Sequence, residues 1–194
     1  MNFIEAYMNE VREIADKIDK SRISELVIAL KNLQESKGRL FILGVGGSAG
    51  NSGHAVNDFR KLAGIEAYAP TDNISELTAR TNDEGWETAF TGYLQASNFT
   101  SNDCILVLSV GGGDMERKIS VNICNAIDYA KNKNARIFGI VGRKGGYTDQ
   151  HADICLVIPM VNPENITPHS ESFQAIIWHL LVMHPEINKK STKW

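Results

Sequence analysis

The stretch ILGVGGSAGNSGHAVNDF, residues 42–59, places a glycine-rich loop directly after an apolar run and continues with residues of helical type. This order indicates a strand, a tight turn and the N-terminus of a helix, where backbone N–H groups and the Ser48 hydroxyl can hold a small anion. The alternative is a turn without a ligand, because glycine also serves turns that bind nothing. The helix behind the loop carries His54 and Asp58, which a phosphate loop alone does not need.

Two nucleotide-binding motifs, the dinucleotide-binding G-x-G-x-x-A motif and the P-loop, also place a glycine-rich loop between a strand and a helix. Residues 44–49 satisfy G-x-G-x-x-A, but the next predicted strand ends in Ala69-Pro70 and lacks the acidic residue that holds a ribose. A P-loop is excluded because no Gly-Lys-Ser or Gly-Lys-Thr follows. A dinucleotide-dependent enzyme is therefore the weakest of the interpretations that stay open.

On both sides of this stretch, apolar runs alternate with segments of helical periodicity. Strands that are continuous apolar runs, each followed by a helix, predict a parallel sheet covered on both faces. In such sheets ligands bind at the carboxyl ends of the strands. Residues 2–36 predict two helices, which we expect to pack on another subunit. The predicted strands are 39–45, 66–69, 104–109, 136–141 and 154–158, and the predicted helices are 48–62, 74–97, 114–132 and 168–183.

Composition narrows the class of protein. The chain of 194 residues fits one domain, and its net charge of -3 with a pI near 6.0 argues against a nucleic-acid surface. Three widely spaced cysteines without a C-x-x-C motif indicate buried thiols in a reducing compartment. No apolar stretch reaches the roughly 18 residues of a membrane span, and the first residues do not resemble a signal peptide. We expect a cytoplasmic protein without membrane or nucleic-acid partners.

A second glycine-rich loop, LSVGGGDMERK at 108–118, follows the third predicted strand. Asp114 is expected to cap the next helix, with Arg117 facing out of its first turn. Two such loops at one sheet edge indicate an elongated polar ligand held at two points. The alternative is that the three glycines only allow close packing against a neighbouring chain.

Histidines and carboxylates form the third feature. His54 and Asp58 are four residues apart and so share one face of a helix. The C-terminal segment TPHSESFQAIIWHLLVMHP, residues 167–185, adds Glu171 and His179. Two imidazoles with two carboxylates suit zinc or another transition metal, and without metal they suit acid–base catalysis. A histidine in an apolar helix is, however, more often a core residue.

These residues resemble a known family. The segment GVGGSAGNSGHAVNDF, the TND at 81–83, the loop at 109–114 and the terminal helix with His179 resemble a sugar isomerase (SIS) domain. Within that family the chain is most similar to phosphoheptose isomerases, which convert sedoheptulose 7-phosphate to D-glycero-D-manno-heptose 7-phosphate for lipopolysaccharide or capsule. The resemblance covers nearly the whole chain, 1–194, as one SIS domain with a helical pair at 1–36 and an α/β core at 37–194.

The resemblance implies a fold, an assembly and a site. The fold would be a flavodoxin-like three-layer α/β/α sandwich with a five-stranded parallel sheet, and the assembly a homotetramer with sites at subunit interfaces. Asp58 and His179 would be the catalytic residues. The residues implied to hold zinc are His54, Asp58, Glu171 and His179. Those implied to contact the sugar phosphate are Val45, Gly46, Gly47, Ser48, Asp58, Asn82, Asp83, Ser109, Val110, Gly111, Asp114 and Glu171.

The sequence departs from the family pattern at several of these positions. Where the family has Ser-Thr-Ser-Gly-Asn-Ser, this chain has SVGGGD at 109–114, which keeps one hydroxyl and adds a carboxylate. Asp58 replaces a glutamate, Glu171 a glutamine and Val45 an asparagine. Glu171 and His179 are eight residues apart, about 12 Å along an ideal helix. They can share one ion only if Glu171 precedes the regular helix or the two come from different chains.

The leading prediction is an aldose–ketose isomerase that acts on a phosphorylated sugar through a metal-assisted enediol mechanism. The intact set of histidines and carboxylates favours catalysis. The alternative is a non-catalytic SIS domain that binds a sugar phosphate or regulates a protein partner, and the loss of hydroxyls at 110–114 favours it.

Overall fold

A computed structural model of the chain describes residues 2–190 and contains a five-stranded parallel sheet in the order β2-β1-β3-β4-β5. This flavodoxin-like order places β1 and β3, whose carboxyl ends carry the two glycine-rich loops, next to each other. The predicted parallel sheet is therefore confirmed. Its strands are β1 (Leu40–Leu43), β2 (Ala67–Tyr68), β3 (Cys104–Ser109), β4 (Arg136–Val141) and β5 (Ile154–Val157).

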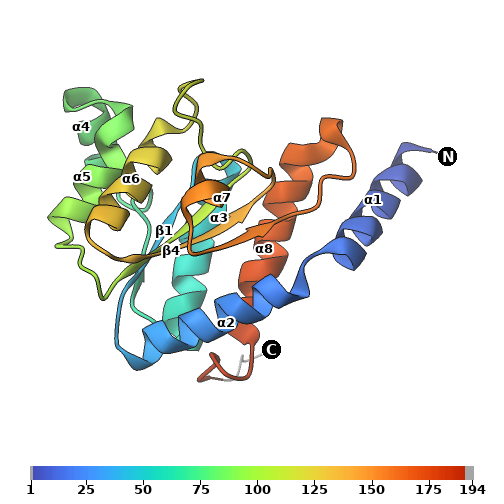
Figure 1. Cartoon of the computed structure of the whole chain (residues 1–194), viewed down its shortest axis with the longest axis horizontal. Helices are drawn as coiled ribbons and strands as arrows, with labels where there is room; N and C mark the ends of the chain where they lie inside the picture. The colour runs from blue at the N-terminus through green and yellow to red at the C-terminus, as the bar shows by residue number, and fades with distance from the viewer. Residues whose placement is uncertain (1, 191–194) are drawn as a thin grey trace.

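Helices cover both faces of the sheet, as Figure 1 shows. The alternation of side chains along β1 explains this: Leu40 and Ile42 enter one buried apolar cluster, while Phe41 and Leu43 enter the other. The first cluster includes residues of α2 (Lys20–Glu35), α3 (Gly47–Asp58) and α8 (Ile166–Met183). The second includes residues of α5 (Ala89–Ala96) and α6 (Val121–Asn132). The predicted three-layer α/β/α sandwich is thus confirmed.

The first helix, α1 (Phe3–Lys17), extends away from the sheet (Figure 1), and Ile14 is its buried residue. One polar cluster connects it to the start of α8. Glu10 accepts hydrogen bonds from His169 at 2.7 Å and from the side-chain amides of Asn162 and Asn165. These bonds, that from His169 first, lower the pKa of Glu10 to about 2. No helix within residues 2–190 is long and apolar enough to cross a membrane.

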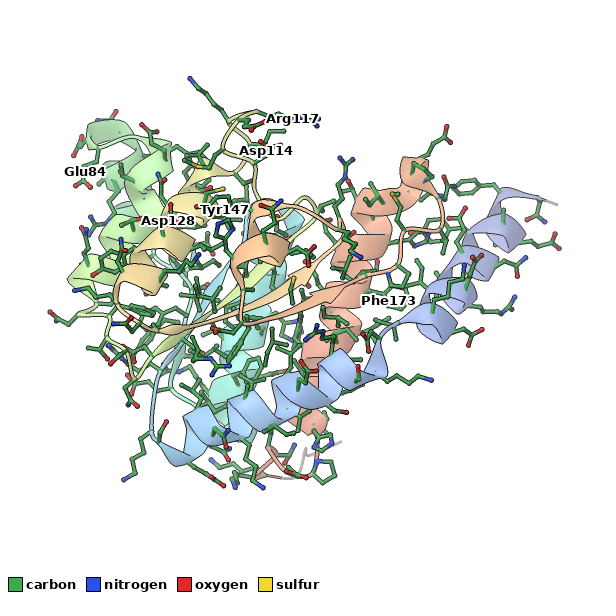
Figure 2. The ribbon with its side chains drawn as sticks, in the orientation of Figure 1. Glu84, Asp114, Arg117, Asp128, Tyr147 and Phe173 are labelled. Carbon is green, nitrogen blue, oxygen red and sulfur yellow. The ribbon has the colours of Figure 1, made fainter. Side chains whose placement is uncertain are left out.

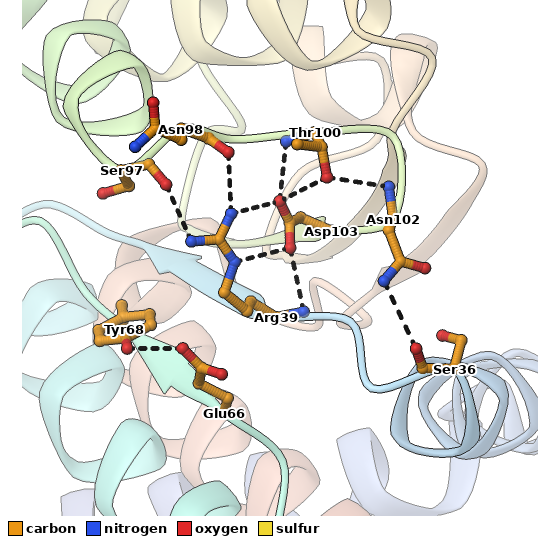
Figure 3. Close-up of polar contacts among 9 residues, drawn as sticks. All are labelled: Ser36, Arg39, Glu66, Tyr68, Ser97, Asn98, Thr100, Asn102 and Asp103. Carbon is orange, nitrogen blue, oxygen red and sulfur yellow. Dashed lines mark hydrogen bonds and ion pairs between the residues drawn. The ribbon is translucent and has the colours of Figure 1, made fainter.

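An ion pair anchors the amino ends of the two central strands (Figure 3). The Arg39 guanidinium donates to both oxygens of the buried Asp103 carboxylate, at 2.9 and 2.7 Å, and also to the carbonyls of Ser97 and Asn98. Burial acts to raise the pKa of Asp103, but the hydrogen bonds from Arg39 and Thr100 outweigh it and the pKa is lowered. The cluster holds β1 against β3 and so sets the position of both loops at the opposite edge.

Several predicted helices differ in extent from those in the structure. The predicted helix at 48–62 ends as α-helix at Asp58 and continues as a π-helical turn, η1 (Phe59–Ala63). The predicted segment at 74–97 divides at Gly85, whose φ of +91° favours glycine, into α4 (Ile74–Asp83), a short 3-10 turn, η2 (Trp86–Thr88), and α5. A short helix, α7 (Tyr147–His151), and a 3-10 turn, η3 (Pro163–Asn165), were not predicted.

The prediction that Asp114 caps a helix is wrong. Its backbone pairs with Ile119 in an antiparallel bridge, and α6 begins at Val121. Ser120, which precedes the helix, has a φ of +50°, so the chain turns sharply before helical geometry starts. Asp114 instead accepts a hydrogen bond from the backbone N–H of Arg117 at 2.9 Å, which closes a turn inside the loop.

Candidate active site

The first glycine-rich loop makes the turn between β1 and α3. Gly46 has a φ of +63°, and its carbonyl accepts from the N–H groups of Ala49 and Gly50. A Cβ at Gly44 would collide with the carbonyl oxygen of Ser48. Both positions therefore require glycine, which explains the composition of the turn without reference to a ligand.

Ser48, predicted to offer its hydroxyl to a ligand, faces the interior. It is 1% exposed, and its hydroxyl donates to Oε1 of Gln174 on α8 at 3.0 Å. Asn51 donates to the same oxygen and to the backbone carbonyl of Glu171. These bonds attach the first turn of α3 to α8, and Gln174 is a contributor that the sequence analysis did not identify.

Glu171 covers the start of α3. Its carboxylate lies so close to Gly47 that a Cβ added there would overlap both carboxylate oxygens. Gly47 is the first residue of α3, where the partial positive charge of a helix N-terminus favours an anion. The side chain of Glu171 therefore already supplies negative charge to the cradle that the sequence predicts for a ligand.

Two histidines and one carboxylate converge further along the same pair of helices. His54 and Asp58 come from α3 and His179 comes from α8, and one ligand atom of each lies within 4.8 Å of the others. Nε2 of His54 is 3.8 Å from Oδ2 of Asp58, and Nε2 of His179 is 3.9 Å from the same oxygen. The His54 and His179 side chains are 59% and 47% exposed, so a ligand or a second chain can reach them.

The orientation of these histidines is set by packing. Nδ1 of His179 lies 2.7 Å from the carbonyl oxygen of Ala175, which can only accept, so Nδ1 carries the proton and Nε2 keeps its lone pair. The indole of the buried Trp178 stacks on the His179 ring at 3.5 Å and meets the His54 ring edge-on at 4.7 Å. The ring of Trp178 therefore restricts both imidazoles.

The donor set of this cluster fits zinc. Two imidazole nitrogens and a carboxylate are the three protein ligands of many catalytic zinc sites, in which a fourth position stays open. Ligand atoms about 2.0–2.2 Å from a tetrahedral ion lie roughly 3.3 Å apart. The three ligand atoms, which all lie within 4.8 Å of one another, would move closer by side-chain rotation to reach that value.

The four-ligand set expected from the sequence does not assemble within one chain. Glu171 lies over Gly47 at the start of α3, whereas His179 lies about two helical turns further along α8. Glu171 is part of the regular helix, which begins at Ile166, so the rise of the helix separates the two side chains. Within residues 2–190, three residues rather than four form the cluster.

The second glycine-rich loop has a different environment. The Ser109 hydroxyl accepts from the backbone N–H of Gly112 at 3.0 Å, and Gly112 and Gly113 have φ values of +76° and +87°. The loop packs against the segment that follows β4: Tyr147 and Thr148 donate their backbone N–H groups to the carbonyls of Gly113 and Gly112. Ser109 therefore holds the loop in shape, and the glycines allow this close backbone packing.

The other residues that the family resemblance implies contact the sugar phosphate do not gather at one place. Asn82 and Asp83 are exposed at the end of α4, where the Asn82 amide donates to Asp83 at 2.7 Å. Val45 is 37% exposed on the first loop. Arg143 and Lys144, which the sequence analysis did not consider, line a cavity together with Gly111. The signal was present as a basic pair before Gly145-Gly146, directly after a predicted strand.

Comparisons with known proteins agree with this architecture, although no family model matches the chain. A phosphoheptose isomerase of Syntrophotalea carbinolica is 25% identical over 91% of this chain and 89% of its own length. One of Roseiflexus sp. is 32% identical over 66% of this chain and 64% of its own length. The structure of phosphoheptose isomerase GmhA from Neisseria gonorrhoeae has a TM-score of 0.80 at 20% identity, and the match covers 92% of this chain and 95% of that one.

The order of the sheet, the N-terminal helices and the structural match define a SIS fold. Within that class, the chain is similar in sequence and in fold to phosphoheptose isomerases over most of its length.

Proposed function

We propose that the chain is a sugar-phosphate isomerase that interconverts sedoheptulose 7-phosphate and D-glycero-D-manno-heptose 7-phosphate. The observation that carries this proposal is the cluster of His54, Asp58 and His179 on facing helices of a phosphoheptose isomerase homologue. A module that only binds its ligand does not need three groups that hold a metal or move protons. We further propose that the protein works in the cytoplasm as a homotetramer.

The proposed reaction moves a proton between neighbouring carbons. A base removes the proton from the carbon next to the carbonyl, which gives an enediol, and an acid returns it to the other carbon. We assign this acid–base work to Asp58 and His179, because Oδ2 of Asp58 lies 3.9 Å from Nε2 of His179. The hydrogen bond to the Ala175 carbonyl keeps the proton of His179 on Nδ1, so Nε2 has a lone pair that can take up a proton or bind a metal.

Asp58 and His179 can instead act as ligands: together with His54 they would hold a zinc ion, which when bound supplies positive charge that stabilises the developing oxyanion. Glu171 remains a proposed ligand only if it comes from a second copy of the chain, since the Glu171 of one chain lies about two turns from its own His179.

The test is exchange of substrate protons in deuterated buffer, with ketose phosphates of five to seven carbons and with or without a chelator. We expect exchange into sedoheptulose 7-phosphate that the chelator removes. His179→Gln should reduce turnover at least 100-fold without loss of fold, because proton transfer by a positioned group contributes 10²–10⁴-fold. The control is His184→Gln, at the C-terminal end of the same helix, which should retain full turnover.

A second function is favoured by one feature, the hydroxyl-poor second loop with its Asp114 carboxylate. A non-catalytic module would bind a sugar phosphate and give no proton exchange with any metal. Full exchange activity in His179→Gln would also contradict the assignment of His179.

A further inference from the structure

A basic cavity lies at the carboxyl edge of the sheet, between the loops that follow β3 and β4. Its volume is about 290 Å³, several times the roughly 30 Å³ share of one liquid water molecule. Figure 2 shows Asp114 and Arg117 on the loop that forms one side of it. The lining residues are Gly111, Gly113, Asp114, Arg117, Ile119, Arg143, Lys144, Gly145 and Gly146.

The charges around this cavity are unbalanced. Arg117, Arg143 and Lys144 supply three positive charges, and Asp114 supplies one negative charge. Arg117 already lies 3.6 Å from the Asp114 carboxylate, which offsets that charge. Arg143 and Lys144 make no hydrogen bond or ion pair with any residue between 2 and 190, although they sit side by side in the sequence. Two adjacent unpaired cations repel each other, and an anion between them relieves that repulsion.

The cavity is preformed because backbone contacts hold its two walls together. The N–H groups of Tyr147 and Thr148 donate to the carbonyls of Gly113 and Gly112, each at 2.9 Å. The Thr148 hydroxyl donates to the Gly112 carbonyl at 2.7 Å, and Gly146 leaves no room for a Cβ against the Gly111 carbonyl. Binding of a ligand therefore requires little ordering of the backbone.

The first loop offers no comparable place for an anion. The carboxylate of Glu171 already covers Gly47 at the start of α3, and the Ser48 hydroxyl points inward to Gln174. A phosphate placed there would face the negative charge of the Glu171 carboxylate. Asp149 is close to the cavity in sequence but does not line it. Its carboxylate accepts a hydrogen bond from the backbone N–H of Gly145 at 2.7 Å.

We propose that Arg143 and Lys144, to which the family resemblance assigns no role, contact the phosphate group of the substrate in this cavity and supply the charge that a loop with a single hydroxyl lacks. The nature of the sugar rests on the function proposed above, whereas binding of the phosphate group does not. Arg143 and Lys144 thereby become the residues that select phosphorylated over unphosphorylated sugars.

The test measures binding by titration calorimetry on the full-length protein, with inorganic phosphate, sedoheptulose 7-phosphate and sedoheptulose as separate ligands. The variant is Arg143→Ala/Lys144→Ala. The matched control, Lys20→Ala/Lys131→Ala, removes two exposed cations from α2 and α6 and changes the net charge equally. We expect the site variant to bind both phosphorylated ligands at least tenfold more weakly, with weaker salt dependence, and the control to bind as the wild type does.

Equal phosphate affinity in the site variant and the wild type would overturn the proposal, and so would no binding of inorganic phosphate to the wild type. Sedoheptulose that binds as tightly as its phosphate would overturn it as well. Circular dichroism of each variant checks that the fold is retained. If phosphate binds through Arg143 and Lys144 but no proton exchange occurs with any ketose phosphate, the proposed isomerase activity fails and this site stands.

Discussion

The two glycine-rich loops have similar composition and opposite electrostatic surroundings. The loop after β1 receives a carboxylate, because Glu171 from α8 covers Gly47. The loop after β3 receives cations, because Arg143 and Lys144 come from the loop after the neighbouring strand, β4. Glycine content thus reports how closely the backbone can approach its neighbours, while the charge of the surrounding side chains determines which ligand each loop can hold.

The two loops also belong to different candidate regions, one for proton transfer and one for phosphate binding. The helices behind the first loop bring His54, Asp58 and His179 together, whereas the second loop forms the wall of the basic cavity. If proton transfer and phosphate binding belong to these different regions, a change in one should leave the other intact.

The largest effect is expected from Asp58→Ala, which removes the oxygen that lies within 4 Å of both histidine nitrogens. Turnover should fall at least 100-fold and stoichiometric zinc should be lost, since a carboxylate ligand and acid–base group disappears. Phosphate binding should change less than twofold. Metal analysis and titration calorimetry measure the two results, and Asp58→Glu, which keeps the carboxylate, should retain zinc.

Loss of phosphate binding together with zinc in Asp58→Ala would show that the two regions form one site and would contradict the separation of proton transfer from phosphate binding.

The second largest effect concerns the anchor that both loops share. Asp103→Asn should lower the free energy of unfolding by about 3 kcal/mol at neutral pH, because it leaves the half-buried Arg39 guanidinium without its anion. The pKa of Asp103 is lowered in the folded state. Its stabilisation is therefore complete above the ordinary carboxyl pKa of about 4 and is lost as the pH falls through the lower folded-state value.

Urea unfolding at several pH values checks this prediction. The difference between wild type and Asp103→Asn should shrink below about pH 4. Asp16→Asn, at an exposed position on α1, is the control and should unfold as the wild type does. A difference that grows in acid would contradict the role of the ionised carboxylate.

A pair of glycine substitutions distinguishes the two loops directly. Gly47→Ala places a methyl group against the Glu171 side chain, and Gly113→Ala places one 2.6 Å from the Cys124 sulfur at a φ of +87°. Each should destabilise the fold by about 1–3 kcal/mol. Addition of Glu171→Ala should recover most of the loss at Gly47, because only a movable side chain is in the way.

Addition of Cys124→Ala should recover less at Gly113, since the positive φ strains any L side chain that replaces glycine. Thermal unfolding of the four variants and two single controls gives the coupling energies. Equal recovery in the two loops would show that backbone conformation does not distinguish them.

The smallest effect is expected from Asp114→Asn. Asparagine keeps the oxygen that accepts from the Arg117 N–H, but it removes the one carboxylate that lines the basic cavity. Phosphate affinity should rise about two- to fivefold, because exposed charges interact by about 0.2–1 kcal/mol. Calorimetry in low and high salt measures the rise, which should fade as salt screens the charges. A loss of affinity would mean that Asp114 orders the cavity mainly through its ion pair with Arg117.

Much of the fold was predictable because it depends on short-range patterns. Four of the five strands carry apolar runs that lie at the predicted positions, and β3 and β4 have the predicted bounds of 104–109 and 136–141. The spacing of His54 and Asp58 placed both on one face of a helix, as observed. The two-residue strand β2 was also predicted from EAYA at 66–69, although with wider bounds.

The resemblance to SIS domains predicted contacts between residues far apart in the sequence, which hydrophobic periodicity cannot predict. It associated His179 with His54 and Asp58 across more than 120 residues of sequence, a pairing that α3 and α8 make by packing side by side. Its four-ligand set did not form in one chain, because Glu171 already belongs to the regular helix. The prediction that Asp114 caps a helix failed for a local reason. Asp before a helical pattern is a common helix cap, but here its side chain accepts a hydrogen bond that closes a turn inside the loop.

By itself the sequence determined the succession of the five strands and most of the helices along the chain, the two glycine turns and the face shared by His54 and Asp58, because each depends on residues within one or two turns of the chain. The tertiary structure alone decided that Glu171 covers Gly47 and that Arg143 and Lys144 line the cavity beside Gly111. These contacts join segments that are distant in the chain. Their positions follow from the sheet order and from how α8 packs on α3, which no local pattern records.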